Sequence, residues 1–337
     1  MAASSKVPAV TPFFEGVYVL LCAWFLGGLY FDAWSHTHHP ELESFINVPH
    51  GVLYSGFMGL AALVFFTAWR NHRAGFSFKR CMPAGYQTAF WATILFLIAG
   101  AGDAIWHTLF GIEHQLEAAF SPTHIGIMIG LTILVSAPFM SAWRRGIELD
   151  VEQARAWPGI LGFTYLLSAF TLVTQWAHPY VEQVLTVAPL DVNQGQALGI
   201  LGFMLQVSIL VGLALLVMRR GIARSGLFTV ALTLNALVLA LMRGSFEVVP
   251  AALLTGLAAD VLLERWQSSG RSILGLRIYA TTLGAVFAAT YFIVIFATKS
   301  VWWSVHMWTG AIVVSAIFGL LISYLVVPPP NFGEPAK

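Results

Sequence analysis

Acidic and histidine side chains recur at matching spacings in two apolar segments of the chain. In each segment an Asp and a His four residues apart are followed by a second His, 14 residues later in the first segment and 17 in the second. The residues are Asp32, His36 and His50, and then Asp103, His107 and His124. Four residues are about one helical turn, so each Asp–His pair is expected on one helix face.

Each segment carries a further His and a further Glu before its last His. These are His39 and Glu43 in the first segment, and His114 and Glu117 in the second. Imidazole and carboxylate groups together suit divalent transition metals, while His also relays protons near neutral pH. We predict a metal centre with the ligands Asp32, His36, His39, His50, Asp103, His107, His114 and His124. Glu43 and Glu117 are the predicted catalytic carboxylates, which would move protons.

The composition places these polar residues in a membrane protein. Of the 337 residues 58% are apolar and 10% are charged, whereas soluble domains carry about 25% charged residues. Asp, Glu and His are costly near a bilayer core and mark functional sites there. No basic run suggests nucleic-acid binding, and phosphate-binding, dinucleotide-binding, serine-hydrolase and zinc-protease motifs are absent from the sequence.

Apolar runs of about 20 residues predict ten transmembrane helices, because only helices of this length satisfy their own backbone groups in lipid. The predicted spans are 13–31, 50–69, 87–108, 123–143, 158–177, 195–218, 226–243, 247–264, 273–297 and 302–326. The expected fold is an all-α polytopic bundle. Residues 1–143 would hold the two metal-site hairpins, 13–69 and 87–143, as a tandem parallel repeat. Residues 144–337 would form a six-helix scaffold in the same membrane domain.

Basic residues predict the orientation. Most Lys and Arg residues fall in the loops 70–86, 144–157, 219–225 and 265–277, which the positive-inside rule places in the cytoplasm. Both termini are then cytoplasmic, and the predicted site lies on the extracytoplasmic side of the cytoplasmic membrane. Nine of the ten histidines fall on that side, and whether His178 and His306 join the site stays open.

The first segment resembles a known metal motif. Asp32 and His36 followed by His50 resemble the Asp-x3-His…His motif in the C subunit of the membrane copper monooxygenases, which oxidise methane and ammonia. The resemblance covers some 20 residues and implies that these three side chains bind copper within the membrane near its outer face. The ten predicted spans, the second copy and the added Glu and His residues depart from that pattern.

The predicted function is a metal-dependent membrane oxidoreductase that activates oxygen on a small or lipid-soluble substrate, with one or two ions, copper or iron favoured and zinc the alternative. Two other functions stay open: a metal transporter or metal-delivery factor, and a zinc-dependent lipid hydrolase. Few polar residues continue through the predicted spans below the His-rich end, which favours a fixed site over a transport path. The expected partners are the bilayer, the substrate, and further membrane subunits or a second copy of the chain.

Overall fold

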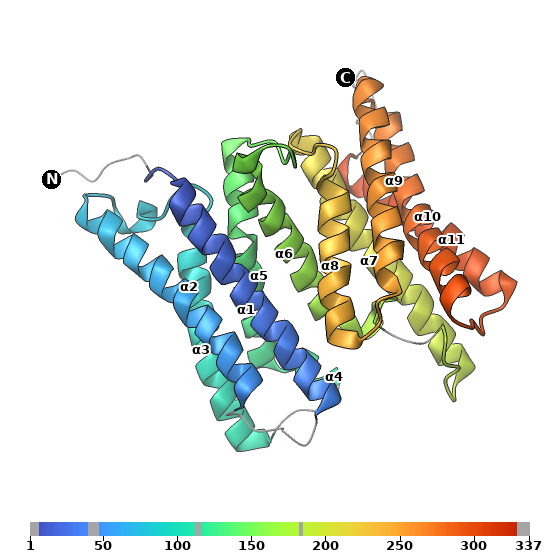
Figure 1. Cartoon of the computed structure of the whole chain (residues 1–337), viewed down its shortest axis with the longest axis horizontal. Helices are drawn as coiled ribbons and strands as arrows, with labels where there is room; N and C mark the ends of the chain where they lie inside the picture. The colour runs from blue at the N-terminus through green and yellow to red at the C-terminus, as the bar shows by residue number, and fades with distance from the viewer. Residues whose placement is uncertain (1–6, 40–46, 112–115, 182–184, 329–337) are drawn as a thin grey trace. The chain divides into compact units, whose positions relative to one another are not determined.

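The computed structural model describes residues 7–39, 47–111, 116–181 and 185–328, with only the backbone of Ala118 and Ala119. The chain forms two compact units, residues 1–173 and 174–337. Long helices make up most of both units (Figure 1).

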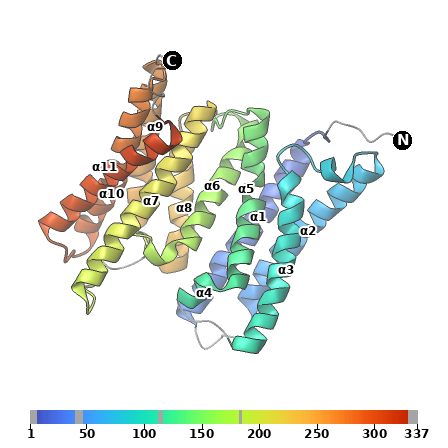
Figure 2. The ribbon, with the colours of Figure 1, turned by 180° about the vertical axis from the view of Figure 1, so that it is seen from behind.

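The first unit contains two helical hairpins and one further helix. The first hairpin is α1 (Pro12–His38) with α2 (Val48–Arg73), and the second is α3 (Gln87–Phe110) with α5 (Pro122–Arg145), joined by the short α4 (Leu116–Phe120). The hairpins lie against each other, with α1–α2 on one side and α3–α5 on the other (Figures 1 and 2). The fifth long helix, α6 (Trp157–Val173), packs on α5 and α1.

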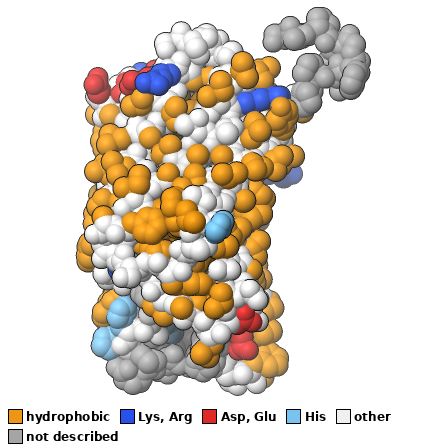
Figure 3. All heavy atoms as spheres, turned by 90° about the vertical axis from the view of Figure 1, so that its right-hand side faces the viewer, with side chains coloured by type: hydrophobic (Ala, Val, Ile, Leu, Met, Phe, Trp, Pro, Cys, Tyr) orange, Lys and Arg blue, Asp and Glu red, His pale blue; other side chains and the backbone are white. Residues whose placement is uncertain are grey.

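The second unit holds α7 (Val192–Arg220), α8 (Leu227–Arg243), α9 (Val248–Ser268), α10 (Ile273–Thr298) and α11 (Val305–Val326). Contacts run from α8 to α9, α10 and α11, and then to α7. Apolar side chains are spread over the whole face shown in Figure 3, and the charged ones lie mainly toward its ends. Such an apolar exterior is suited to lipid rather than water.

Each of the ten predicted spans overlaps one of these ten long helices, although the span 158–177 runs past the end of α6 at Val173. Eight of them are long and apolar enough to cross a membrane. Of the other two, α8 has only 17 residues and α9 carries Asp260, Glu264 and Arg265. The prediction of an all-α polytopic membrane bundle is confirmed.

Buried Asp260 of α9 has a structural explanation. Helix α8 begins after Gly226, which has no side chain to cap the first turn. The Asp260 carboxylate accepts hydrogen bonds from the backbone N–H groups of Phe228, at 3.2 Å, and Thr229, at 2.9 Å, and from the Thr229 hydroxyl at 2.6 Å. A carboxylate at a helix N-terminus accepts hydrogen bonds from the unpaired backbone N–H groups and interacts favourably with the helix dipole. Asp260 therefore links α9 to the start of α8.

A buried acid holds the hairpins of the first unit together at one end. Glu15 in the first turn of α1 is paired with Arg145 in the last turn of α5. The same Glu15 oxygen accepts hydrogen bonds from Tyr86 at 3.5 Å and from Ser141 at 3.4 Å. The histidine-bearing helix ends lie at the opposite end of the unit (Figure 1). The contacts of Glu15 therefore fix the packing of the two hairpins at the end of the unit opposite the candidate site.

Glycines let α1 and α2 approach closely just below the histidines. A Cβ atom at Gly28 would lie 2.7 Å from the Leu53 Cα, and one at Gly56 would lie 2.8 Å from the Phe25 Cα. Backbone atoms cannot yield as a flexible side chain would, so only glycine fits at this crossing. Gly28 lies one turn before Asp32, so the crossing also fixes the separation of Asp32 from α2.

The glycine contact gives a matched pair of substitutions. We expect Gly28→Ala to lower the unfolding temperature in detergent, because the added methyl group overpacks the helix crossing at a cost of about 1–3 kcal/mol. Gly27→Ala is the control: a Cβ atom there meets nothing within 4 Å, and Ala favours helix over Gly. Equal thermal stability of the two variants would contradict the assigned crossing.

Candidate metal centre

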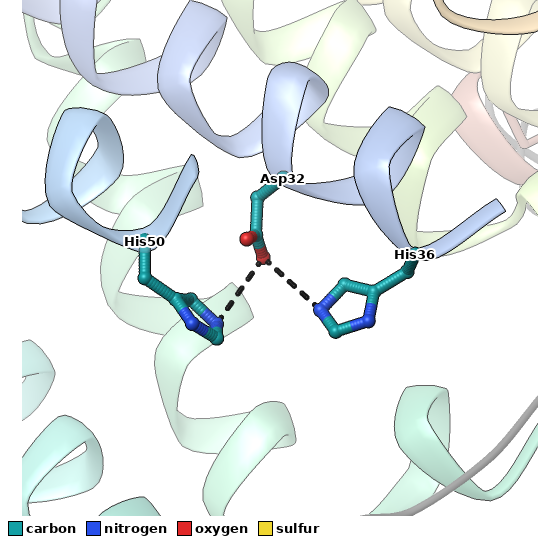
Figure 4. A group of neighbouring side chains, drawn as sticks. All are labelled: Asp32, His36 and His50. Atoms are coloured by element: carbon teal, nitrogen blue, oxygen red, sulfur yellow. Dashed lines mark ion pairs between the residues drawn. The ribbon is translucent and has the colours of Figure 1, made fainter. Parts of the chain in front are cut away.

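The first hairpin brings together one carboxylate and two imidazoles (Figure 4). Asp32 and His36 lie one turn apart near the end of α1, and His50 is the third residue of α2. The Asp32 Oδ2 atom lies 3.7 Å from the His36 Nε2 atom and 3.5 Å from the His50 Nε2 atom. All three candidate ligand atoms lie within 4.8 Å of one another. The spacing of four residues in the sequence has put both α1 side chains on the face that meets α2.

The start of α2 is fixed by its own sequence. The Asn47 side chain caps the helix by accepting the His50 backbone N–H at 2.8 Å, and Pro49 occupies the first turn. A capping Asn and a first-turn Pro both specify where a helix begins. These two residues therefore fix where α2 begins, and with it the position from which the His50 ring reaches Asp32.

The second hairpin repeats this arrangement. The Asp103 Oδ2 atom lies 3.3 Å from the His107 Nε2 atom, and its Oδ1 atom lies 3.6 Å from the His124 Nε2 atom. The three ligand atoms again lie within 4.8 Å of one another. Ser121 caps α5 and Pro122 occupies its first turn, so His124 is the third helical residue, as His50 is in α2.

Hydrogen bonds support the second group from behind. The Thr123 hydroxyl donates to the Asp103 Oδ1 atom at 2.8 Å. The His107 Nδ1 atom lies 3.2 Å from the Gly111 carbonyl oxygen, which can only accept, so this nitrogen carries the proton. In the neutral ring the His107 Nε2 atom then points its lone pair toward Asp103. Such support is typical of metal-binding histidines.

Tyr54 lies between the two groups. It follows His50 by one turn on α2, with its ring centroid 6.2 Å from that of His50. Its hydroxyl lies 3.8 Å from where a Cβ atom of Gly100 would be, one turn before Asp103 on α3. Asp32 and Asp103 both act electrostatically on the phenol and on each other. The groups are thus neighbours, but among the described residues each is formed by its own hairpin.

The other predicted site residues of the first unit are not members of these two groups or lie outside the described residues. His39 follows α1 as its C-cap residue, with its ring centroid 5.2 Å from that of Trp34. Glu117 is exposed in α4. Glu43 and His114 lie outside the described residues. The sequence did not predict a role for Tyr54 or Thr123. The features that could have identified them are their positions: Tyr54 lies one turn after His50, and Thr123 directly precedes His124.

His178 and His306 belong to the second unit. His306 is the second residue of α11 and is exposed. His178 is only 4% exposed, and its Nδ1 atom accepts the Tyr180 backbone N–H at 3.0 Å. Burial lowers the pKa of His178 to about 3. The imidazole is therefore neutral and has a local structural role.

The lowered pKa of His178 predicts acid sensitivity of the second unit. The unfolded chain binds a proton at this residue below about pH 6.5 and the folded chain does not, so the free energy of unfolding should fall as the pH drops. We expect a loss of up to about 2 kcal/mol between pH 7 and pH 5. His178→Asn keeps an acceptor for Tyr180 and should remove this part of the pH dependence of thermal unfolding in detergent. An unchanged pH dependence in that variant would contradict the assignment.

Comparison with known protein families, curated proteins and solved structures finds no match for this chain. Its assignment therefore depends on its own residues. They show a helical membrane protein with two Asp–His–His groups that are each able to hold a metal ion.

Proposed function

We propose that this chain is a membrane metalloprotein in which each hairpin of the first unit binds one divalent transition-metal ion. One observation carries the proposal: two hairpins each converge two imidazole nitrogens and one carboxylate oxygen within 4.8 Å. Their matching order along the chain supports a tandem repeat of one metal-binding hairpin.

The spacing of the ligand atoms suits an ion. The Asp–His separations of 3.3–3.7 Å are longer than good hydrogen bonds, which span about 2.7–3.2 Å. Ligands held about 2.1 Å from a tetrahedral metal lie about 3.4 Å from one another.

Burial of the acids also favours a cation. Asp32 and Asp103 are 7% and 4% exposed, and a buried carboxylate is costly without compensating charge. The Asp32 Oδ1 atom is buried with no hydrogen-bond partner in the described part of the chain. A divalent ion would compensate this oxygen and use the imidazole lone pairs as well.

The ligand set favours a reactive centre over a purely structural one. Two His and one carboxylate leave coordination positions open, a pattern typical of non-haem iron oxygenases, and imidazole also suits copper and zinc. Bound iron or copper would supply redox chemistry with oxygen. We therefore propose an oxidoreductase acting on a small or lipid-soluble substrate, with Glu43 and Glu117 as the proposed proton-transfer carboxylates.

The proposed setting follows from the charge pattern of the loops. By the positive-inside rule, the basic loops support a cytoplasmic position for both termini and an extracytoplasmic position for both groups. A bilayer-dissolved substrate could reach helix ends at that depth. Further membrane subunits or a second copy of this chain are the proposed protein partners.

One observation favours metal delivery as a second candidate. The His36 side chain is 40% exposed, so a ligand of the first group is accessible to an incoming acceptor. A delivery factor would bind its ion reversibly, whereas an oxidoreductase keeps its ion through turnover. The retention of metal during purification separates the two functions.

Metal analysis tests the proposal. Purified, reconstituted protein should contain about two ions per chain, because each Asp–His–His group supplies three ligands. We expect the double variants His36→Ala/His50→Ala and His107→Ala/His124→Ala each to retain about one ion by mass spectrometry of the metal. His38→Ala is the control, since its ring bonds the Trp34 carbonyl of its own helix at 2.9 Å and should not change the content.

The identity of the metal then selects the reaction. Iron or copper supports oxygen chemistry, tightly held zinc supports hydrolysis, and readily exchanged metal supports delivery or transport. Less than about half an ion per chain after reconstitution would remove every one of these functions.

A further inference from the structure

We infer that the two groups have different tasks: the Asp103 group holds its ion tightly, and the Asp32 group is an open site at which a small ligand can join the coordination. This inference rests on the proposed metal function. It comes from the surroundings of two ligand sets that are otherwise alike.

The two carboxylates differ in their support. The Asp103 Oδ1 atom receives the Thr123 hydroxyl at 2.8 Å. The matching position before the second His of the first group is Pro49, which has no donor to offer. The Asp32 Oδ1 atom is accordingly buried without a hydrogen-bond partner among the described residues. Asp103 is therefore oriented before an ion arrives, whereas an ion itself must orient Asp32.

The imidazoles next to these acids differ in the same direction. The His107 Nδ1 atom donates to the Gly111 carbonyl at 3.2 Å, and the His107 side chain is 14% exposed. In the described part of the chain His36 makes no corresponding hydrogen bond, and its side chain is 40% exposed. The His107 ring is therefore held and shielded, while the His36 ring lacks the matching hydrogen bond within the described chain and is accessible to an incoming ligand.

The third ligand of the second group, His124 on α5, also has a hydrogen-bond partner. The His124 Nδ1 atom lies 2.8 Å from the Ser121 hydroxyl, the same residue that caps the helix. All three ligands of the second group thus have a hydrogen-bonded partner behind them. Loss of such outer partners typically lowers metal affinity by about 10–100-fold, so the Asp103 group should bind its ion more tightly by a factor in this range.

Two single-site proteins test the difference with Co²⁺ as the probe. The variant His36→Ala/His50→Ala leaves only the Asp103 group, and His107→Ala/His124→Ala leaves only the Asp32 group. Titration against a competing chelator should show at least about tenfold tighter Co²⁺ binding by the first protein. Added azide should change the visible Co²⁺ spectrum of the second protein and leave that of the first unchanged.

Exchange of the supporting residue gives an independent readout. In the protein with only the Asp103 group, Thr123→Val should weaken Co²⁺ binding by about tenfold or more. Thr108→Val is the matched control, because its hydroxyl bonds the Ala104 carbonyl of its own helix at 2.7 Å. In the protein with only the Asp32 group, Pro49→Thr should tighten binding, since it places a hydroxyl at the position of Thr123.

The outcomes separate this inference from the proposed function. Co²⁺ affinities within about threefold of each other, or equal azide responses, would overturn the inference and leave two metal sites in place. Failure of both folded single-site proteins to bind Co²⁺ would overturn the metal function itself. Folding is checked by an unfolding temperature in detergent close to that of the parent protein.

Discussion

The first unit is organised around two carboxylates that are buried at the ends of membrane helices. Asp32 and Asp103 are almost inaccessible, and a buried charge must be compensated where it lies. In each hairpin two imidazoles approach the acid, one a turn further along the same helix and the other at the start of the next, and the proposed cation would supply the compensating charge. The second helix of each hairpin must therefore begin at the right residue and approach the first helix closely, so that its His reaches the acid.

The helix caps and the glycine crossing provide this start position and this close approach. Asn47 and Ser121 cap the returning helices so that their third residue is the His. Gly28 lets α2 approach α1 one turn from Asp32. At the other end of the unit, the Glu15–Arg145 pair ties the first hairpin to the second. Local sequence chemistry and tertiary contacts thus specify the same arrangement, which is typical of sequences with one well-defined fold.

Sequence patterns were sufficient for the helices and for the three members of each group, although the predicted ligands also included His39 and His114. A spacing of four residues places Asp32 and His36 on one face whatever the tertiary structure, and long apolar runs in lipid must be helical. The sequence could not show whether the hairpins share one set of ligands, because that depends on the distance between α2 and α3. It also could not show the support by Thr123, since a Thr before a His acquires that role only when its hydroxyl meets a carboxylate on another helix. Tyr54 was missed for a similar reason: an aromatic residue in a membrane helix is ordinarily an interfacial or packing residue.

The proximity of the groups adds a constraint that neither group has alone. One carboxylate compensates only half of the charge of a divalent ion, so two loaded groups would each keep a net positive charge. Asp32 and Asp103 are close enough to interact and both act on Tyr54, so ions bound to them would repel each other through an environment of low dielectric constant. If both groups bind ions as proposed, binding of the first would weaken binding of the second even with equal ligand sets. In the proposed scheme the Thr123 hydroxyl makes the Asp103 group the first to fill, and the less supported Asp32 group is the one whose occupancy responds to an incoming ligand.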